Sequence, residues 1–106
     1  MSELRRGTLV FCVLALLDDR ERYAVELVGE LTGSEALATG AGTIYPLLSR
    51  LRTDGLISST WRESPSGPPR RYYRLTGEGR DALGAFRGEW ARFRRAVDHI
   101  LEKGAA

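Results

Sequence analysis

Residues 42–80 read GTIYPLLSRLRTDGLISSTWRESPSGPPRRYYRLTGEGR, and the order of the patterns in this stretch decides the fold. Its first part predicts an amphipathic helix, because apolar residues recur there at helical spacing. The helix is expected to end at Asp54-Gly55, since glycine readily adopts the left-handed conformation that a helix C-terminus needs. The apolar side of this helix consists of Ile44, Leu47, Leu48 and Leu51.

Two strands are expected after that helix. Residues 56–63 are rich in Ile, Thr and Trp, which is typical of a β-strand, and residues 70–75 return as a second strand. The intervening PSGPP, residues 65–69, is expected to form the turn, because prolines interrupt regular structure. A helix followed by a two-stranded hairpin with a basic tip predicts a winged helix, and with it an α+β, mainly α fold.

Two further helices are expected before this stretch. Residues 9–17 form an apolar run that has no polar side, so we expect a partner subunit to cover what the small domain cannot. Arg5-Arg6 before the run imitates a signal peptide. Asp18-Asp19, and not an A-x-A site, follow the run directly, and the run is too short for a bilayer, so we expect neither a signal peptide nor a membrane span. The second helix carries Tyr23, Leu27, Val28 and Leu31, and the glycine-rich residues 36–42 would complete a helix-turn-helix.

The segments GTIYPLLSRLRTDGLI, SGPPRRYYRLT and the trailing GR resemble the PadR family of bacterial transcriptional regulators. LRRGTLVFCVLALL and YAVEL near the N-terminus match the same family's first two helices, so the resemblance covers about residues 4–100. It implies a winged helix-turn-helix domain over residues 1–76 and a C-terminal dimerisation helix over residues 77–103. The implied function is that of a cytoplasmic, homodimeric repressor, bound to a pseudo-palindromic operator on the nucleoid and released by a small molecule.

The last helix is expected to begin after Thr76, whose hydroxyl can cap it. Apolar residues then recur at alternating spacings of three and four, which is the a/d pattern of a coiled coil. Gly84 and Gly88 weaken the helix, by up to about 1 kcal/mol each relative to alanine, and we expect packing against a partner to offset this loss. The predicted dimer interface consists of Leu83, Phe86, Trp90, Phe93, Val97 and Ile100.

Trp90 and Phe93 lie in the middle of this predicted interface, near the expected symmetry axis. Their rings either pack on one another across the axis or leave a slot for a flat, apolar effector molecule. Regulators similar to this chain sense aromatic ligands at the same interface. Trp90 and Phe93 are therefore the candidate effector-binding residues.

The net charge of the chain is only +2, but it is unevenly distributed. Residues 42–76 contain six arginines against Asp54 and Glu63, a net +4, so the rest of the chain carries −2. Concentrated basic charge on a winged helix favours double-stranded DNA as the partner. The candidate DNA contacts are small or polar residues of the central helix and two arginines after the proline turn: Gly42, Thr43, Tyr45, Ser49, Arg50, Arg70 and Arg71.

Two aromatic residues in this region have alternative interpretations. Tyr45 either stacks on the sugar-phosphate backbone or caps the hydrophobic core. Trp61 is expected in the core or in a subunit contact, and not on DNA. We expect the side chains of Arg70 and Arg71 to project from the hairpin tip in a defined direction, because the two prolines before them stiffen the turn.

Catalytic and metal-binding patterns are absent from the sequence. Cys12 and His99 are the only residues of their types, and no acid-base pair or set of three metal ligands accompanies them. Cys12 reads as a small core residue and His99 as a favourable charge near a helix C-terminus. We expect no enzyme activity, cofactor or metal. Two alternatives to the ligand-responsive repressor are a DNA-binding protein without an effector and a winged-helix protein-interaction module.

Overall fold

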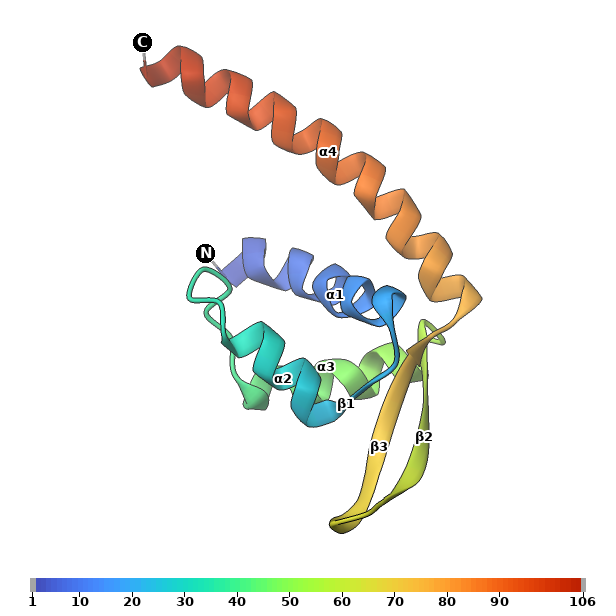
Figure 1. Ribbon diagram of the computed structural model, residues 1–106. Helices are drawn as coiled ribbons and strands as arrows, with labels where there is room; N and C mark the ends of the chain where they lie inside the picture. Colours follow the sequence, from blue (N-terminus) through green and yellow to red (C-terminus); the bar gives the residue numbers. More distant parts are fainter. Residues whose placement is uncertain (1, 106) are drawn as a thin grey trace.

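The computed structural model describes residues 2–105, including the side chains of residues 7–104. It is mainly helical, with one small antiparallel sheet whose strand order is β1-β3-β2, and it confirms the predicted winged helix (Figure 1). Helix α4 lies over α1, and the β2–β3 hairpin projects from the opposite side of the molecule. The elements are α1 Ser2–Asp19, β1 Arg22–Tyr23, α2 Ala24–Thr32, α3 Ala41–Thr53, β2 Ile57–Ser64, β3 Gly67–Leu75 and α4 Gly77–Ala105.

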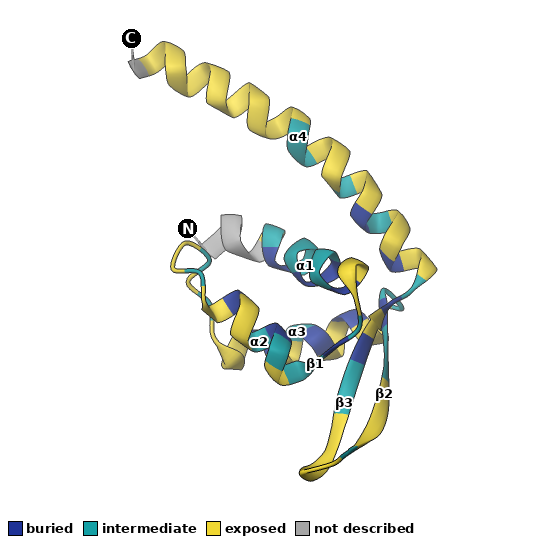
Figure 2. Cartoon of the chain, viewed as in Figure 1, coloured by how far each residue is buried: buried dark blue, intermediate teal, exposed yellow. Residues whose placement is uncertain are grey.

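A single hydrophobic core lies between α1, α2, α3, the base of the hairpin and the first turns of α4 (Figure 2). The apolar side predicted for α3 is confirmed, since Ile44 and Leu48 are fully buried and Leu51 is nearly so. One side of the apolar run of α1 is buried in this core, and the other side of the run is half-buried. The core consists of Val13, Leu14, Leu17, Leu27, Leu31, Ile44, Leu48, Leu51, Ile57, Tyr73, Leu75 and Leu83.

The hairpin turn is shorter than the sequence suggests. Only Pro65 and Ser66 form it, and Pro68 and Pro69 lie within β3, so the prediction of a five-residue proline turn is wrong. The prolines are tolerated because β1 pairs only with Tyr72 and Tyr73, which leaves this outer part of β3 without a second neighbour. The register also shifts here, since Arg62 pairs with Arg70 but Ser64 pairs with Gly67, and the extra residue in β3 relieves the remaining pairing demand at the prolines.

Strand β1 is an element that the sequence did not predict. Arg22 pairs with Tyr73 and Tyr23 pairs with Tyr72, which adds a third strand to the expected two-stranded hairpin. Tyr23 then serves as the N-cap of α2, and its backbone N–H donates to the Glu26 carboxylate at 3.1 Å. This short strand therefore joins the hairpin to the first helix of the helix-turn-helix.

The start of α4 is held by the cap that the sequence predicted. The Thr76 hydroxyl accepts a hydrogen bond from the Gly79 N–H at 3.0 Å and donates to the Gly55 carbonyl at 2.7 Å. Gly55 has the positive φ of 81° that the C-terminus of α3 requires. Gly79 packs so tightly that a Cβ there would lie 2.0 Å from the Leu56 carbonyl oxygen. The ends of α3 and β3 are thus fixed to the first turn of α4.

The first half of α4 packs on α1, and the second half extends beyond the domain. The ring of Phe86 stacks on Phe11 of α1, and Asp18 at the end of α1 pairs with Arg80 at 3.4 Å and Arg87 at 3.7 Å. From residue 92 onwards every described side chain of α4 is exposed (Figure 2). The molecule is correspondingly elongated, with principal extents of 58 × 28 × 20 Å.

Candidate nucleic-acid interface

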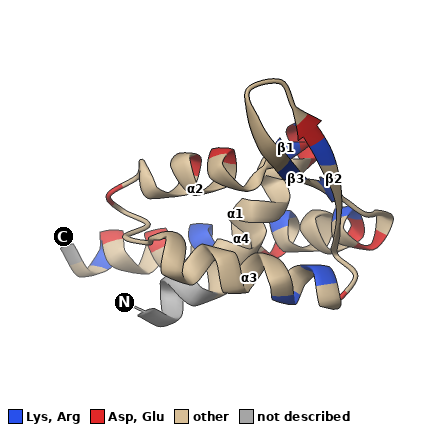
Figure 3. Cartoon of the chain, turned by 90° about the horizontal axis from the view of Figure 1, so that it is seen from below, with Lys and Arg blue, Asp and Glu red and all other residues tan. Residues whose placement is uncertain are grey.

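Helix α3 presents a continuous exposed side next to the hairpin, and basic positions recur on both (Figure 3). The helix runs unbroken through Pro46, which is exposed and sits where no core contact depends on it. Because Pro46 has no N–H, the carbonyl of Gly42 four residues earlier lacks its helical partner and is open to solvent. Of the predicted DNA contacts, Gly42, Thr43, Ser49 and Arg50 are all exposed on this side.

Tyr45 lies at the surface and is 43% exposed, so it does not cap the core. Burial raises the pKa of Tyr73, and the charges of Arg71 and Arg52 act against that shift, while Tyr45 adds to it. Tyr73 shares the hydrophobic core with Ile44 and Leu48 of α3, so the sheet face that carries Tyr73 packs toward that helix.

The hairpin has two faces because alternate residues of a strand point to opposite sides. The inner face continues from the core, and the outer face adjoins Tyr23 of β1. Arg70 and Arg71 are adjacent in β3 and therefore lie on different faces. The inner face carries Ile57, Ser59, Trp61, Arg71, Tyr73 and Leu75, and the outer face carries Ser58, Thr60, Arg62, Arg70, Tyr72 and Arg74.

Trp61 lies outside the core and is largely exposed, so the prediction of a core position is wrong. It is 62% exposed, because the core ends at Tyr73 and Trp61 lies further along the hairpin. The guanidinium carbon of Arg71 lies 4.5 Å from the centroid of its ring. On the outer face, Arg70 lies 4.5 Å from the Tyr23 ring and Arg62 lies 4.7 Å from the Tyr72 ring.

Ion pairing separates the arginines of this region from those of the α1–α2 junction. At the junction, Arg20 pairs with Glu26 and Arg22 pairs with Asp19. Asp18, at the end of α1, pairs with Arg80 and Arg87 of α4. Among the arginines of residues 42–76, Arg62 pairs with Glu21. Within the described part of the chain, no carboxylate pairs with the other five: Arg50, Arg52, Arg70, Arg71 and Arg74.

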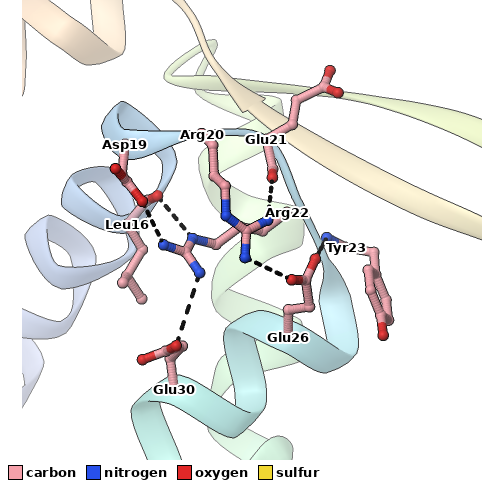
Figure 4. A network of polar contacts seen from close by, with 8 residues as sticks. All are labelled: Leu16, Asp19, Arg20, Glu21, Arg22, Tyr23, Glu26 and Glu30. Atoms are coloured by element: carbon pink, nitrogen blue, oxygen red, sulfur yellow. Dashed lines mark hydrogen bonds and ion pairs between the residues drawn. The ribbon is translucent and has the colours of Figure 1, made fainter.

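The α1–α2 junction is a polar cluster that the sequence reading missed (Figure 4). Arg22 is only 7% exposed, and its Nε donates to the Leu16 carbonyl at the end of α1 at 2.9 Å. Its terminal nitrogens reach Asp19 at 2.9 Å and Glu30 of α2 at 3.9 Å. Burying this charge is tolerated because it is paired and hydrogen-bonded. The cluster fixes the orientation of α1 relative to the helix-turn-helix.

The apolar stripe of α4 divides into two parts. Leu83 is 2% exposed in the core of the chain, which leaves it no surface for a partner and removes it from the predicted interface. Phe86 and Trp90 are half-buried against α1. The remaining residues are open to solvent: Phe93 at 60%, Val97 at 37%, Ile100 at 64% and the unpredicted Leu101 at 64%.

A mostly apolar cavity of about 370 Å³ lies between α1, α4 and the loop before α3. Phe11, Cys12, Leu37, Phe86 and Trp90 contribute to its lining. Phe93, the other candidate effector residue, is not among the lining residues. Burial raises the pKa of the Cys12 thiol, which keeps it protonated and unreactive.

Within residues 2–105 no helix is long and apolar enough to cross a membrane. The described side chains include no group of three potential metal ligands.

Known proteins resemble this chain in sequence and in fold. The sequence model of the transcriptional regulator PadR-like family matches residues 13–85. Transcriptional regulator Rv3488 of Mycobacterium tuberculosis is 37% identical over 83 residues, which are 78% of this chain and 76% of that protein. The structure of a PadR-like transcription factor from Bacteroides fragilis is 41% identical, with a TM-score of 0.77 and coverage of 93% of this chain and 95% of that one. A PadR-like transcriptional regulator from Bacillus cereus is 32% identical, with a TM-score of 0.84 and coverage of 93% and 96%.

Proposed function

Because the chain belongs to the PadR-like family of transcriptional regulators, we propose that it acts as a homodimer on a pseudo-palindromic DNA operator. In each protomer the exposed side of α3 enters the major groove, which is wide enough for a helix. Gly42, Thr43 and Ser49 let the helix backbone approach the base edges closely. Arg50 and Tyr45 lie where they reach the sugar-phosphate backbone beside the groove.

The observation that carries DNA binding is the concentration of arginines on α3 and the hairpin, since within the described residues no carboxylate pairs with Arg50, Arg52, Arg71 or Arg74. An arginine held by a carboxylate has part of its charge already neutralised, and an unpaired one is free to neutralise a phosphate and release a counterion. The junction arginines are paired and serve the fold. Arg92, Arg94 and Arg95 of α4 are also exposed, but they lie on the far side of the molecule from the hairpin.

The second half of α4 is the proposed dimer contact. Phe93, Val97, Ile100 and Leu101 expose apolar area along one side of the part of α4 whose described side chains are all exposed. An isolated helix with such a stripe is marginal in water, and burying the stripe against a second copy removes that cost. The half-buried Trp90 and Phe86 continue the same stripe toward α1, where a partner's helix would extend the contact.

We further propose that the protein is a repressor whose DNA affinity falls when a flat, apolar molecule binds. The cavity of about 370 Å³ next to Trp90 suits such a ligand in size and polarity. Leu37, in its wall, lies four residues before α3. A ligand that displaces Leu37 would therefore act on the start of the DNA-reading helix.

Footprinting on the DNA upstream of the protein's own gene tests this function. We expect two protected half-sites related by a dyad, with centres about one helical turn or roughly 34 Å apart. Salt should weaken the complex steeply, since phosphate contacts release counterions. Absence of protection at every site, with partner binding that ignores salt, would instead favour a protein-interaction module.

The effector proposal needs its own test. In a Trp61→Phe background Trp90 is the only remaining tryptophan, because the chain has two. Flat aromatic compounds that release the operator should quench its fluorescence saturably. Release of DNA by a compound that leaves Trp90 fluorescence unchanged would exclude this cavity, and no release by any compound would favour a regulator without an effector.

A further inference from the structure

Trp61 and Arg71 form a cross-strand unit on the inner face of the hairpin. They are direct partners in the β2–β3 register, and the Arg71 guanidinium lies over the indole ring with 4.5 Å between its carbon and the ring centroid. Arg71 Nη1 also donates to the Ser59 hydroxyl at 2.7 Å. Two contacts thus hold the guanidinium in one orientation.

This unit is built like a binding element because its apolar and charged parts both remain available. The indole is 62% exposed, although burying a tryptophan is among the largest apolar gains that a domain can make. A guanidinium stacked on a ring keeps the N–H groups at its edge free to donate in its own plane. Within the described residues no carboxylate pairs with Arg71.

The inner face is also the side of the hairpin that adjoins α3. Tyr73, the next residue of β3 after Arg71 on this face, belongs to the same buried cluster as Ile44 and Leu48 of α3. A duplex seated against the exposed side of α3 therefore meets Arg71 and Trp61 next. The outer face carries Arg70, whose guanidinium covers Tyr23 of β1 and thereby braces the hairpin against the helix-turn-helix.

We propose that Trp61 and Arg71 together grip the sugar-phosphate backbone of the bound duplex, and that Arg70 does not contact DNA. The prealigned guanidinium donates to a phosphate, and the exposed indole packs against the adjoining deoxyribose. Prealignment matters because an arginine that is already ordered loses less side-chain entropy on binding. The inference rests on the proposed DNA-binding function. It assigns Arg71 to a phosphate contact and Arg70 to the support of the hairpin.

The test compares three alanine variants of the full-length protein: Trp61→Ala, Arg71→Ala and, as the matched control one residue away, Arg70→Ala. The probes are a 30-base-pair duplex selected from random sequence and an unrelated duplex of the same length. We expect Trp61→Ala and Arg71→Ala to weaken binding to both duplexes on the order of tenfold. Arg71→Ala should also reduce the slope of log affinity against log salt by about one per protomer. Arg70→Ala should leave affinity within about twofold, and Trp61→Phe should restore most of the loss in Trp61→Ala.

Fluorescence supplies a readout that a folding defect cannot imitate. In a Trp90→Phe background, Trp61 is the sole tryptophan, and its emission should change when either duplex binds. If wild-type protein binds no duplex in a salt-dependent way, the proposed function itself is wrong. If wild type binds but Arg70→Ala weakens binding as much as Arg71→Ala, the inference alone is overturned. Unchanged affinity and emission at Trp61 would likewise overturn it and indicate a protein partner for this face.

Discussion

The ring of Phe11 on α1 lies flat on the ring of Phe86 on α4, with 4.0 Å between centroids and 3° between planes. The stack continues through Trp90, whose centroid lies 6.0 Å from that of Phe86. It is the aromatic contact that joins the first helix of the domain to the helix that leaves it.

Removing both rings should cost less than the sum of removing each one, because the two rings stabilise the fold through the same contact. We expect a double-mutant cycle of Phe11→Ala and Phe86→Ala to give a coupling energy of about 0.5–1.5 kcal/mol. Urea unfolding at one fixed protein concentration measures it. Strict additivity would mean that the rings contribute to stability independently.

Phe93→Glu should convert the dimer to monomer, since it introduces a charge into the middle of the proposed apolar contact. Sedimentation velocity measures the change. Arg95→Gln alters the net charge by the same single unit on the opposite side of α4 and should leave the dimer intact. A folded dimer of the Phe93→Glu variant would contradict the proposed contact.

Gly79→Ala should lower the free energy of unfolding by about 1–3 kcal/mol or more, because the new methyl group would overlap the Leu56 carbonyl. Gly29→Ala is the matched control. Nothing lies within 4 Å of a Cβ at Gly29 in α2, so this change should stabilise the helix by up to about 1 kcal/mol. Denaturant midpoints of the two variants should therefore move in opposite directions.

Glu26 should contribute stability that acid removes. Burial acts against its ionisation, but hydrogen bonds from the Tyr23 N–H and the Arg20 guanidinium outweigh burial and lower the pKa of its carboxyl. Because that pKa is lower in the folded chain, ionised Glu26 stabilises the fold above the unfolded pKa, and this contribution disappears as the pH falls through the folded value.

Glu26→Gln should accordingly be less stable than wild type at pH 7, and the difference should shrink between about pH 5 and pH 3. Chemical denaturation at several pH values measures it, with Glu35→Gln in the exposed loop as the control. A difference that stays constant across this range would mean that packing, and not the charge, makes Glu26 useful.

Features that depend on local spacing could be predicted from the sequence. The buried side of α3, the Thr76 cap and the inward orientation of Tyr73 and Leu75 each follow from residues a few positions apart. The role of Gly55 at the end of α3 was predictable for the same reason, since helices commonly end at a glycine in the left-handed conformation.

Features that depend on distant segments could not be predicted. A two-residue strand such as β1 shows no alternation, and its partners lie about fifty positions away. Leu83 and Phe93 belong to one continuous heptad pattern, which does not reveal where the protomer's own core stops and free surface begins. Trp61 was misplaced for a related reason: its burial depends on how far the hairpin extends past the core.

Helix α4 has 29 residues, which at 1.5 Å per residue makes it about 44 Å long, and roughly half of that length lies beyond Trp90. It is therefore a lever whose fulcrum is the Phe11–Phe86 stack. The free end at Ala105 lies 19 residues or about 28 Å beyond Phe86, so a tilt of about 10° there displaces it by about 5 Å, which is between the rise of one base pair and that of two. If two such helices are joined at their far ends in the proposed dimer, the ends stay together and the displacement passes to the α3 helices, which we propose bind DNA. A small rearrangement of the aromatic rings would then shift these helices by a distance comparable to the base-pair rise of a duplex.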